Sequence, residues 1–202
     1  MRQIFPIAAL VAALSVGVSS GANNGNVSEP AFRDNFTSDQ LGAKWATPKG
    51  EWTIENGALV GRELAADKHG AVLNLAIPNK DSHIHFRFQL DGARNFNLSL
   101  NHSKGHLFRV HFKPDGLTMA ADKVKGDPAS KVETIAHAAT KFETGRWYEV
   151  DVEMQGAHVS VTTDNGVAVE GSHPLLDTRK PNYRFVMRDG DVRLDDVTVW
   201  MK

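Results

Sequence analysis

The chain has 202 residues, with 23 Lys and Arg against 24 Asp and Glu, which gives a formal net charge of −1 at neutral pH. Because acidic and basic residues are interspersed, we expect neither nucleic acid nor anionic lipid as a partner. The chain contains no cysteine, which excludes disulfides, a thiol nucleophile, thiolate metal ligands and the lipid-accepting cysteine of a bacterial lipoprotein.

The first 22 residues have the pattern of a bacterial-type secretory signal peptide. Arg2 supplies a positive start, residues 7–18 are largely apolar, and Ser20-Gly21-Ala22 supplies the small residues of a cleavage site. We predict a signal peptide over residues 1–22 and a flexible polar leader over 23–31. The protein is then exported, either periplasmic or secreted. The apolar run is shorter than the ~20 residues that a membrane helix needs, so we predict no membrane insertion.

The rest of the chain, residues 32–202, predicts a single all-β domain. Turn signals recur about every ten residues, and no long segment has helical periodicity. About 180 mature residues can bury the core that an exported domain without disulfides requires.

Alternation of apolar and polar residues is clearest in the middle of the chain. It marks three strands, over 83–90, 96–101 and 107–113, with turn signals at Asp91-Gly92 and Lys104-Gly105 between them. We expect hairpin connections at both turns, which would make the three strands neighbours in one sheet.

Further strands are predicted towards the end of the chain, over residues 147–154, 158–162, 183–187 and 192–200. Residues 127–139 fit either a short helix or a strand. The β-branched Val132, Thr134 and Ile135 favour the strand.

Short patterns in a fixed order mark the edges of these strands: Phe32-Arg33-Asp34-Asn35-Phe36, Leu41-Gly42-Ala43-Lys44-Trp45, Gly50-Glu51-Trp52, Gly145-Arg146-Trp147-Tyr148 and Val192-Arg193-Leu194-Asp195-Asp196. Together they resemble the concanavalin A-like lectin/glucanase sandwiches that include the 3-keto-disaccharide hydrolase domain, which is common in exported bacterial proteins. The resemblance implies a two-sheet antiparallel β-sandwich, or jelly roll, and a saccharide or glycoside as partner.

One stretch departs from that family and bears on activity. Where the family often has Asn-Ser-Gly, this chain has Asn95-Phe96-Asn97. Our first hypothesis is therefore an exported carbohydrate-recognising β-sandwich that binds a saccharide on a polar sheet face. A glycoside hydrolase similar to the 3-keto-disaccharide hydrolases is the alternative, and a structural envelope protein without a ligand is the second alternative. Whether the protein is an enzyme stays open.

The polar faces of the central strands supply the candidate ligand-binding residues. They are rich in Arg, His and amide groups, which suit sugar hydroxyls or a carboxylated sugar, and the alternative is a merely solvated sheet face. The candidates are His83, His85, Arg87, Gln89, Asn97, Ser99, Asn101, Arg109 and His111, with Trp147 from a later strand. Arg87 is expected to be central and to face Asn97 or Ser99 across the hairpin.

Glu149, Asp151 and Glu153 form a second constellation. Their Glu-x-Asp-x-Glu spacing resembles the catalytic strand of laminarinase- and lichenase-type glycoside hydrolases, which implies a nucleophile and an acid/base at the outer two positions. Their place after Gly145-Arg146-Trp147 resembles a later, non-catalytic strand, so a solvated acidic face is the alternative.

These hypotheses require no cofactor. The sequence does offer two candidate metal sites. Asp34, Asp195 and Asp196 would supply oxygen ligands to a structural Ca²⁺ if the terminal strands are adjacent, and turn capping is the alternative. His83 and His85 could share a zinc ion with His111.

Overall fold

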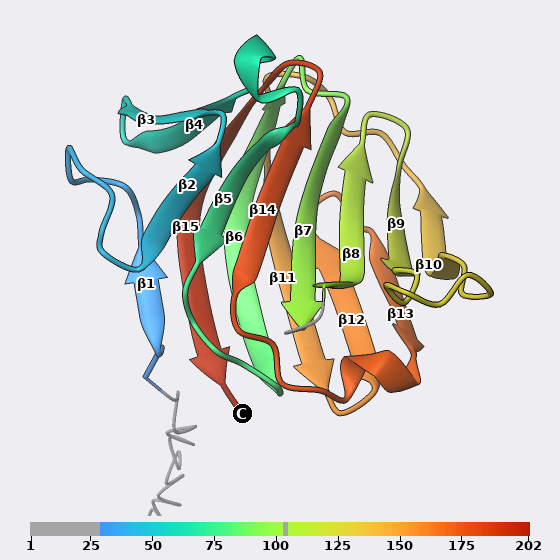
Figure 1. Cartoon of the computed structure of the whole chain (residues 1–202). Helices are drawn as coiled ribbons and strands as arrows, with labels where there is room; N and C mark the ends of the chain where they lie inside the picture. The colour runs from blue at the N-terminus through green and yellow to red at the C-terminus, as the bar shows by residue number, and fades with distance from the viewer. Residues whose placement is uncertain (1–28, 103–104) are drawn as a thin grey trace, which may run out of the picture.

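The computed structural model describes residues 29–102 and 105–202. The predicted signal peptide and residues 23–28 of the predicted leader lie outside the described residues. The strands form two antiparallel sheets, A and B, that pack face to face (Figure 1). The predicted all-β sandwich fold is confirmed. None of the helices in the described ranges has the length and apolar character needed to cross a membrane.

Sheet A contains eight strands of the described chain. Seven follow the order β13 (Ala168–Ser172), β12 (His158–Thr163), β11 (Trp147–Gln155), β6 (Ser82–Asp91), β15 (Asp191–Met201), β4 (Ala58–Arg62) and β3 (Glu51–Glu55). The eighth strand, β1 (Phe32–Asp34), pairs with the second half of β15. The first and last described strands are therefore hydrogen-bonded neighbours.

Sheet B contains seven strands of the described chain, in the order β10 (Glu133–Ala139), β9 (Gly116–Ala121), β8 (Gly105–Lys113), β7 (Asn95–His102), β14 (Tyr183–Arg188), β5 (Ala71–Leu75) and β2 (Trp45–Lys49). The two 3-10 helices in the described ranges, η1 (Ala65–Asp67) and η2 (Pro174–Leu176), are short connectors. The ambiguous stretch 127–139 is thus a strand from Glu133 onward.

Aromatic side chains join the two sheets. The inward residues Phe86 and Phe88 of β6 are fully buried and meet Phe96, Phe112 and Phe185 of sheet B. Ring centroids lie 4.8 Å apart for Phe88 and Phe112, 5.1 Å for Phe88 and Phe96, and 5.3 Å for Phe86 and Phe185. Such pairs contribute about 0.5–1.5 kcal/mol beyond the burial of their area, so they hold the sandwich together without disulfides.

The connection from β6 to β7 crosses from sheet A to sheet B, and the prediction of a hairpin there is wrong. β6 pairs with β11 and β15, whereas β7 pairs with β8 and β14. The crossing chain is held by bonds from Ala93 N to the Asp191 carbonyl (3.3 Å) and from Arg94 N to the Arg188 carbonyl (3.1 Å). Both strands bury their apolar side chains in the same core from opposite sides, so their polar faces point in opposite directions.

Two glycines allow this crossing to pack against the turn between β14 and β15. Gly190 has a φ of 137°, and a Cβ on it would lie 2.2 Å from the carbonyl carbon of Gly92. Because a side chain at Gly190 would both clash and strain the backbone, the contact requires glycine.

Candidate functional site

The outer face of sheet B carries a groove along β7. Asn97 and Ser99 of β7 lie between two longer sets of side chains, one from β8 and one from β14. Ser99 is in register with Arg109 on one side and with Arg184 on the other. A cavity of about 90 Å³ lies here, and we call it the front groove. It is lined by His69, Asn95, Asn97, Ser99, His106, Arg109, His111, Arg184, Val186 and Arg188.

The depth of the front groove follows from side-chain length. Neighbouring strands lie about 4.8 Å apart, so long residues on β8 and β14 rise on both sides of short residues on β7. Asn97 is only 4% exposed and Ser99 only 1%, although both point out of the sandwich. They form a floor on which Arg109 and Arg184 flank Ser99, and His111 and Val186 flank Asn97.

Several polar atoms in the front groove lack a hydrogen-bond partner within the described part of the chain. These are Asn97 Oδ1, Ser99 Oγ and Arg184 Nε. Buried polar groups in native proteins are nearly always paired, and leaving one unpaired costs about 1–3 kcal/mol. The unpaired groups therefore point to a site that is completed by a polar ligand or by water.

The charge in the front groove is positive. Arg109 Nε lies 3.2 Å from Asp122 Oδ2, whereas Arg184 and Arg188 form no ion pair with a carboxylate of the described residues. Burial, and secondly the neighbouring Arg109, lowers the pKa of Arg184. Burial together with Arg109 lowers the pKa of His111 to about 4, so this imidazole is neutral at pH 7.

A larger cavity of about 820 Å³ adjoins the front groove and shares His106 and Arg109 with it. Residues 122–128 and Val132 form its other wall, and we call it the side cavity. Its lining includes the exposed apolar side chains Val124 and Val132. At the rim, His106 Nδ1 lies 3.0 Å from Asn101 Oδ1.

Half of the predicted ligand-binding residues lie on the opposite side of the molecule. His83, His85, Arg87, Gln89 and Trp147 all belong to the outer face of sheet A, because β6 and β11 are paired there. The expectation that Arg87 faces Asn97 or Ser99 is wrong, since those residues point out of sheet B. The zinc hypothesis is also wrong as stated, because His111 lies on the other outer face from His83 and His85.

Arg87 has its own partners on sheet A. Its Nη1 lies 3.5 Å from Asp195 Oδ2 and 3.3 Å from Asp196 Oδ2, and its guanidinium stacks 5.1 Å from the Trp147 ring. A β-bulge in β15, with Asp196 at a φ of 50°, places the two consecutive aspartates beside Arg87.

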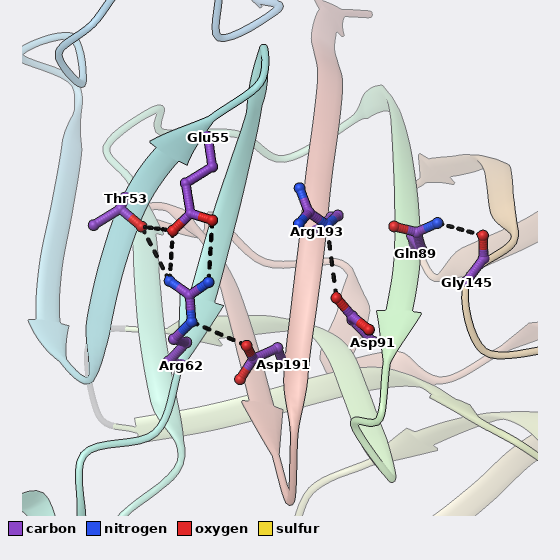
Figure 2. A network of polar contacts seen from close by, with 8 residues as sticks. All are labelled: Thr53, Glu55, Arg62, Gln89, Asp91, Gly145, Asp191 and Arg193. Atoms are coloured by element: carbon purple, nitrogen blue, oxygen red, sulfur yellow. Dashed lines mark hydrogen bonds and ion pairs between the residues drawn. The ribbon is translucent and has the colours of Figure 1, made fainter.

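Other charges on sheet A are paired as well. Figure 2 shows Arg62 between Glu55, at 2.7 Å, and Asp191, at 2.9 Å, and Arg193 beside Asp91 at 3.7 Å. The hydrogen bonds from Arg62, followed by one from Thr53, lower the pKa of Glu55 to about 2. Many of the charged side chains on the outer face of sheet A therefore form ion pairs with one another.

The candidate catalytic carboxylates belong to this face. Asp151 Oδ1 lies 2.6 Å from His83 Nε2 and 3.1 Å from His85 Nδ1, while Glu153 pairs with Lys202. Glu149 is exposed on the same strand. A catalytic role for Glu149, Asp151 and Glu153 stays a prediction, and they lie across the sandwich from the front groove.

The predicted calcium ligands are near one another, as β1 and β15 pair. Asp34, however, accepts hydrogen bonds from Phe36 N at 2.9 Å and from Trp45 Nε1 at 2.8 Å, which is the turn-capping role. In the described ranges no group of three or more His, Cys, Asp or Glu is arranged to hold a metal ion. Calcium binding by Asp34, Asp195 and Asp196 stays a prediction.

Sequence reasoning found part of the front groove and missed part of it. Asn97, Ser99, Arg109 and His111 come together as expected, with Asn101 at the rim. The missed polar residues of the groove are His69, Asn95, His106, Arg184 and Arg188, and Asp122 of the adjoining side cavity was missed as well. Alternation within 183–188 does place Arg184 and Arg188 on a polar face. No local pattern tells that this strand lies beside β7.

Comparisons with known proteins extend the description of the fold. No protein-family model matches the chain, and the search of curated proteins gives no match. Among solved structures, the fold is similar to the carbohydrate-binding module CBM66 from Bacillus subtilis, with a TM-score of 0.62 and 14% identity over 77% of this chain and 94% of that one.

Two glycoside hydrolases are similar to the same degree. A laminarinase from Flavobacterium sp. UMI-01 has a TM-score of 0.61 and 10% identity, over 86% of this chain and 100% of that one. A non-specific endo-β-1,3(4)-glucanase from family GH16 has a TM-score of 0.62 and 12% identity, over 85% and 90%. At such identities the likeness shows the fold alone, and it confirms the concanavalin A-like sandwich. Membership of the 3-keto-disaccharide hydrolase family is not confirmed.

Proposed function

We propose that the protein binds a saccharide in the front groove. The observation that carries this proposal is the buried floor formed by Asn97 and Ser99, whose Oδ1 and Oγ atoms are unpaired among the described residues while Arg109 and Arg184 flank Ser99. A sugar ring presents several hydroxyls at short spacing, each of which donates and accepts a hydrogen bond. It can therefore satisfy the floor and the flanking guanidinium groups together.

The fold supports this proposal independently of the groove. Solved structures with the same sandwich include a carbohydrate-binding module and enzymes whose names specify glucan or laminarin as substrate. Because one fold can carry many functions, this likeness raises the expectation of a saccharide ligand but does not identify it.

A binding screen with floor variants tests the proposal. An array of oligosaccharides would identify a ligand, whose affinity would then be measured for the wild type, Asn97→Ala and Ser99→Ala. Each variant is expected to lose about three- to tenfold in affinity, as a neutral hydrogen bond contributes about 0.5–1.5 kcal/mol. The melting temperature should stay unchanged or rise, because truncation removes a buried group that has no partner in the free protein.

Ser160→Ala is the matched control, since Ser160 lies on β12 in sheet A and is also partly buried. It should retain full affinity. If Asn97→Ala and Ser99→Ala both destabilise the fold and leave affinity unchanged, the groove floor is structural and the proposal fails.

Glycoside hydrolysis is the alternative function, and the same screen tests it by product release from glycosides and 3-keto-glycosides. Hydrolysis requires carboxylates in contact with the ligand. Asp122, whose side chain is 11% exposed, lies at the junction of the front groove and the side cavity, whereas Glu149 lies on sheet A. Turnover that disappears in Asp122→Asn or Glu149→Gln would establish the enzyme.

We also propose that the protein is exported. The support is the arrangement of Arg2, the apolar residues 7–18 and Ser20-Gly21-Ala22. Mass spectrometry of the protein recovered from the periplasm or medium should give a chain that begins near Asn23. Recovery of the uncleaved chain from the cytoplasm would contradict export.

A further inference from the structure

We propose that the ligand of the front groove is an acidic saccharide, a sugar that carries an anionic group such as a carboxylate. This inference rests on the proposed function and specifies its ligand class. It follows from the distribution of charge between the two outer faces and from the mixture of donors and acceptors in the groove.

The lining of the front groove and the side cavity concentrates positive charge. It contains five cationic side chains, Arg109, Arg184, Arg188, Lys123 and Lys125, against the two carboxylates Asp122 and Asp127. The whole chain has a formal charge of −1. A local excess of cations in a nearly neutral protein therefore requires a corresponding excess of acids elsewhere, and the groove is a place where an anion is attracted.

Arg184 and Arg188 differ from Arg62 and Arg87 of sheet A in having no carboxylate partner among the described residues. Arg62 and Arg87 each have two carboxylate partners on sheet A. Arg184 lies half-buried beside Arg109 and has none among the described residues; Nε is unpaired in both Arg184 and Arg87, so the missing carboxylate is what distinguishes Arg184. Placing two cations together at this depth is unfavourable in the free protein, and an anion bound between them would relieve it.

The groove also contains hydrogen-bond acceptors, which argue against a simple inorganic anion as the ligand. Asn97 Oδ1 can only accept a hydrogen bond, and Asp122 contributes a second acceptor beside Arg109. Phosphate, sulfate or acetate at neutral pH offers few or no donors to such atoms. A sugar acid presents hydroxyl donors for the floor and an anionic group for Arg184 on one small molecule.

The side cavity gives the ligand room to continue beyond one sugar unit. It opens directly from the front groove at His106 and Arg109, and its Lys123 and Lys125 extend the positive lining. Val124 and Val132 add exposed apolar surface on which the carbon face of a sugar ring can pack. An acidic oligosaccharide would contact both cavities.

The test measures binding of four probes by calorimetry to the full mature chain. The probes are a uronic-acid oligosaccharide, a sulfated oligosaccharide, a neutral oligosaccharide of the same length, and inorganic sulfate. We expect at least one acidic oligosaccharide to bind tenfold or more tightly than the neutral one, with affinity that falls as salt is raised. Whichever of the uronic-acid and sulfated oligosaccharides binds more tightly identifies the anionic group as carboxylate or sulfate.

Arg184→Ala should weaken binding of the acidic oligosaccharide by about ten- to a hundredfold, as charge-assisted hydrogen bonds are lost. Its affinity for the neutral oligosaccharide should change by less than about threefold, and its melting temperature should be unchanged or higher. Arg184→Lys should recover part of the lost affinity, because the charge remains but the planar fork does not. Arg193→Ala, on the outer face of sheet A, is the matched control and should bind as the wild type does.

The outcomes separate this inference from the proposed function. If the neutral and acidic oligosaccharides bind equally well, or if Arg184→Ala weakens both alike, saccharide binding stands and the acidic class is rejected. If inorganic sulfate binds as tightly as the acidic oligosaccharide, the site is an anion site and the inference fails. If the folded wild type binds none of the saccharides and none from the array, the proposed function fails and this inference with it.

Discussion

Arg87 illustrates how a residue's partners determine what it can do. It occupies the middle of β6, but its guanidinium is shared by Asp195 and Asp196 and stacks on Trp147. A ligand that used Arg87 would have to compete with two carboxylates already in place. Arg184 lies near the start of β14 in sheet B and has no carboxylate partner in the described chain.

Substitution of Arg87 therefore tests which outer face binds the ligand. Arg87→Ala should lower the stability by about 1 kcal/mol, because Asp195 and Asp196 would repel each other without it. Burial raises the pKa of Asp195, the hydrogen bond that Asp196 N donates to it lowers that pKa, and the charge of the Asp196 carboxylate raises it again to a smaller extent. Saccharide affinity should not change. A tenfold loss of affinity with an unchanged melting temperature would instead place the binding site on sheet A, as the sequence analysis expected.

The Asp151 contacts predict a pH dependence of stability. The hydrogen bond to Asp151 raises the pKa of His85 above its ordinary value of 6.5, so its contribution is present below pH 6.5 and lost as pH rises through the raised pKa. The contacts with His83 and His85 lower the pKa of Asp151 below 3.8, so its contribution is lost only at acid pH. The two windows overlap between about pH 4 and 6.5.

Asp151→Asn should consequently lower the melting temperature most near pH 5.5 and least near pH 8.5. Because the Asp151 side chain is 39% exposed, solvent screening limits the effect to about 1 kcal/mol or less, or about 2–4 °C. Thermal unfolding of wild type and variant across this range gives the measurement. A difference that is constant with pH would mean that Asp151 acts by packing rather than by charge.

At the scale of elements, the sequence predicts which residues form strands better than it predicts which strands pair. Alternation in residues 83–90 and 96–101 correctly assigned the inward Phe86, Phe88 and Phe96 and the outward polar residues, because the side-chain period of two is a local property. Asp91-Gly92 is equally compatible with a hairpin and with a crossing between sheets. Which one forms depends on β14 and β15, which pair with β7 and β6 from about a hundred residues further along the chain.

Because local sequence does not show which distant strands pair, only part of the candidate site could be predicted. The β7–β8 half of the front groove follows from a hairpin, so Asn97, Ser99, Arg109 and His111 could be grouped from the sequence. Arg184 and Arg188 enter the groove through a long-range strand pairing that carries no local signal. The sequence also groups His83 and Arg87 with the β7–β8 residues, because polar side chains that lie close together in sequence do not show which sheet their strands join.

The glycine contact at the crossing gives a prediction for this element. Gly190→Ala should destabilise the protein by more than about 2 kcal/mol, because it combines a left-handed backbone cost of about 1–3 kcal/mol with the clash against Gly92. Gly156→Ala is the control, since Gly156 has a φ of 56° and nothing within 4 Å of its added Cβ. Chemical denaturation compares them. Equal losses would show that the crossing tolerates a side chain and that only the dihedral angle matters.

At the scale of the whole molecule, the sandwich separates two kinds of polar surface. Sheet A presents charges that satisfy one another, as the Arg62 network in Figure 2 illustrates. Sheet B presents arginines and amides that are only partly satisfied. The charged groups on the outer face of sheet A are thus largely paired with one another, whereas those on sheet B can bind a ligand. Substitution of Arg184 on sheet B and of Arg193 on sheet A distinguishes the two faces.

The pairing of β6 with β15 and of β7 with β14 also determines when the protein can fold. The contact between Arg87 of β6 and Asp195 of β15 joins residues 108 positions apart, and β7 pairs with β14 through residues such as Ser99 and Arg184. The strand at the middle of each sheet therefore lacks one neighbour until the final segments of the chain have been synthesised, and closing such long loops is entropically costly and slow. We therefore expect a nascent chain with neither sheet complete to remain unfolded until its last strands are made, which is compatible with the export proposed above.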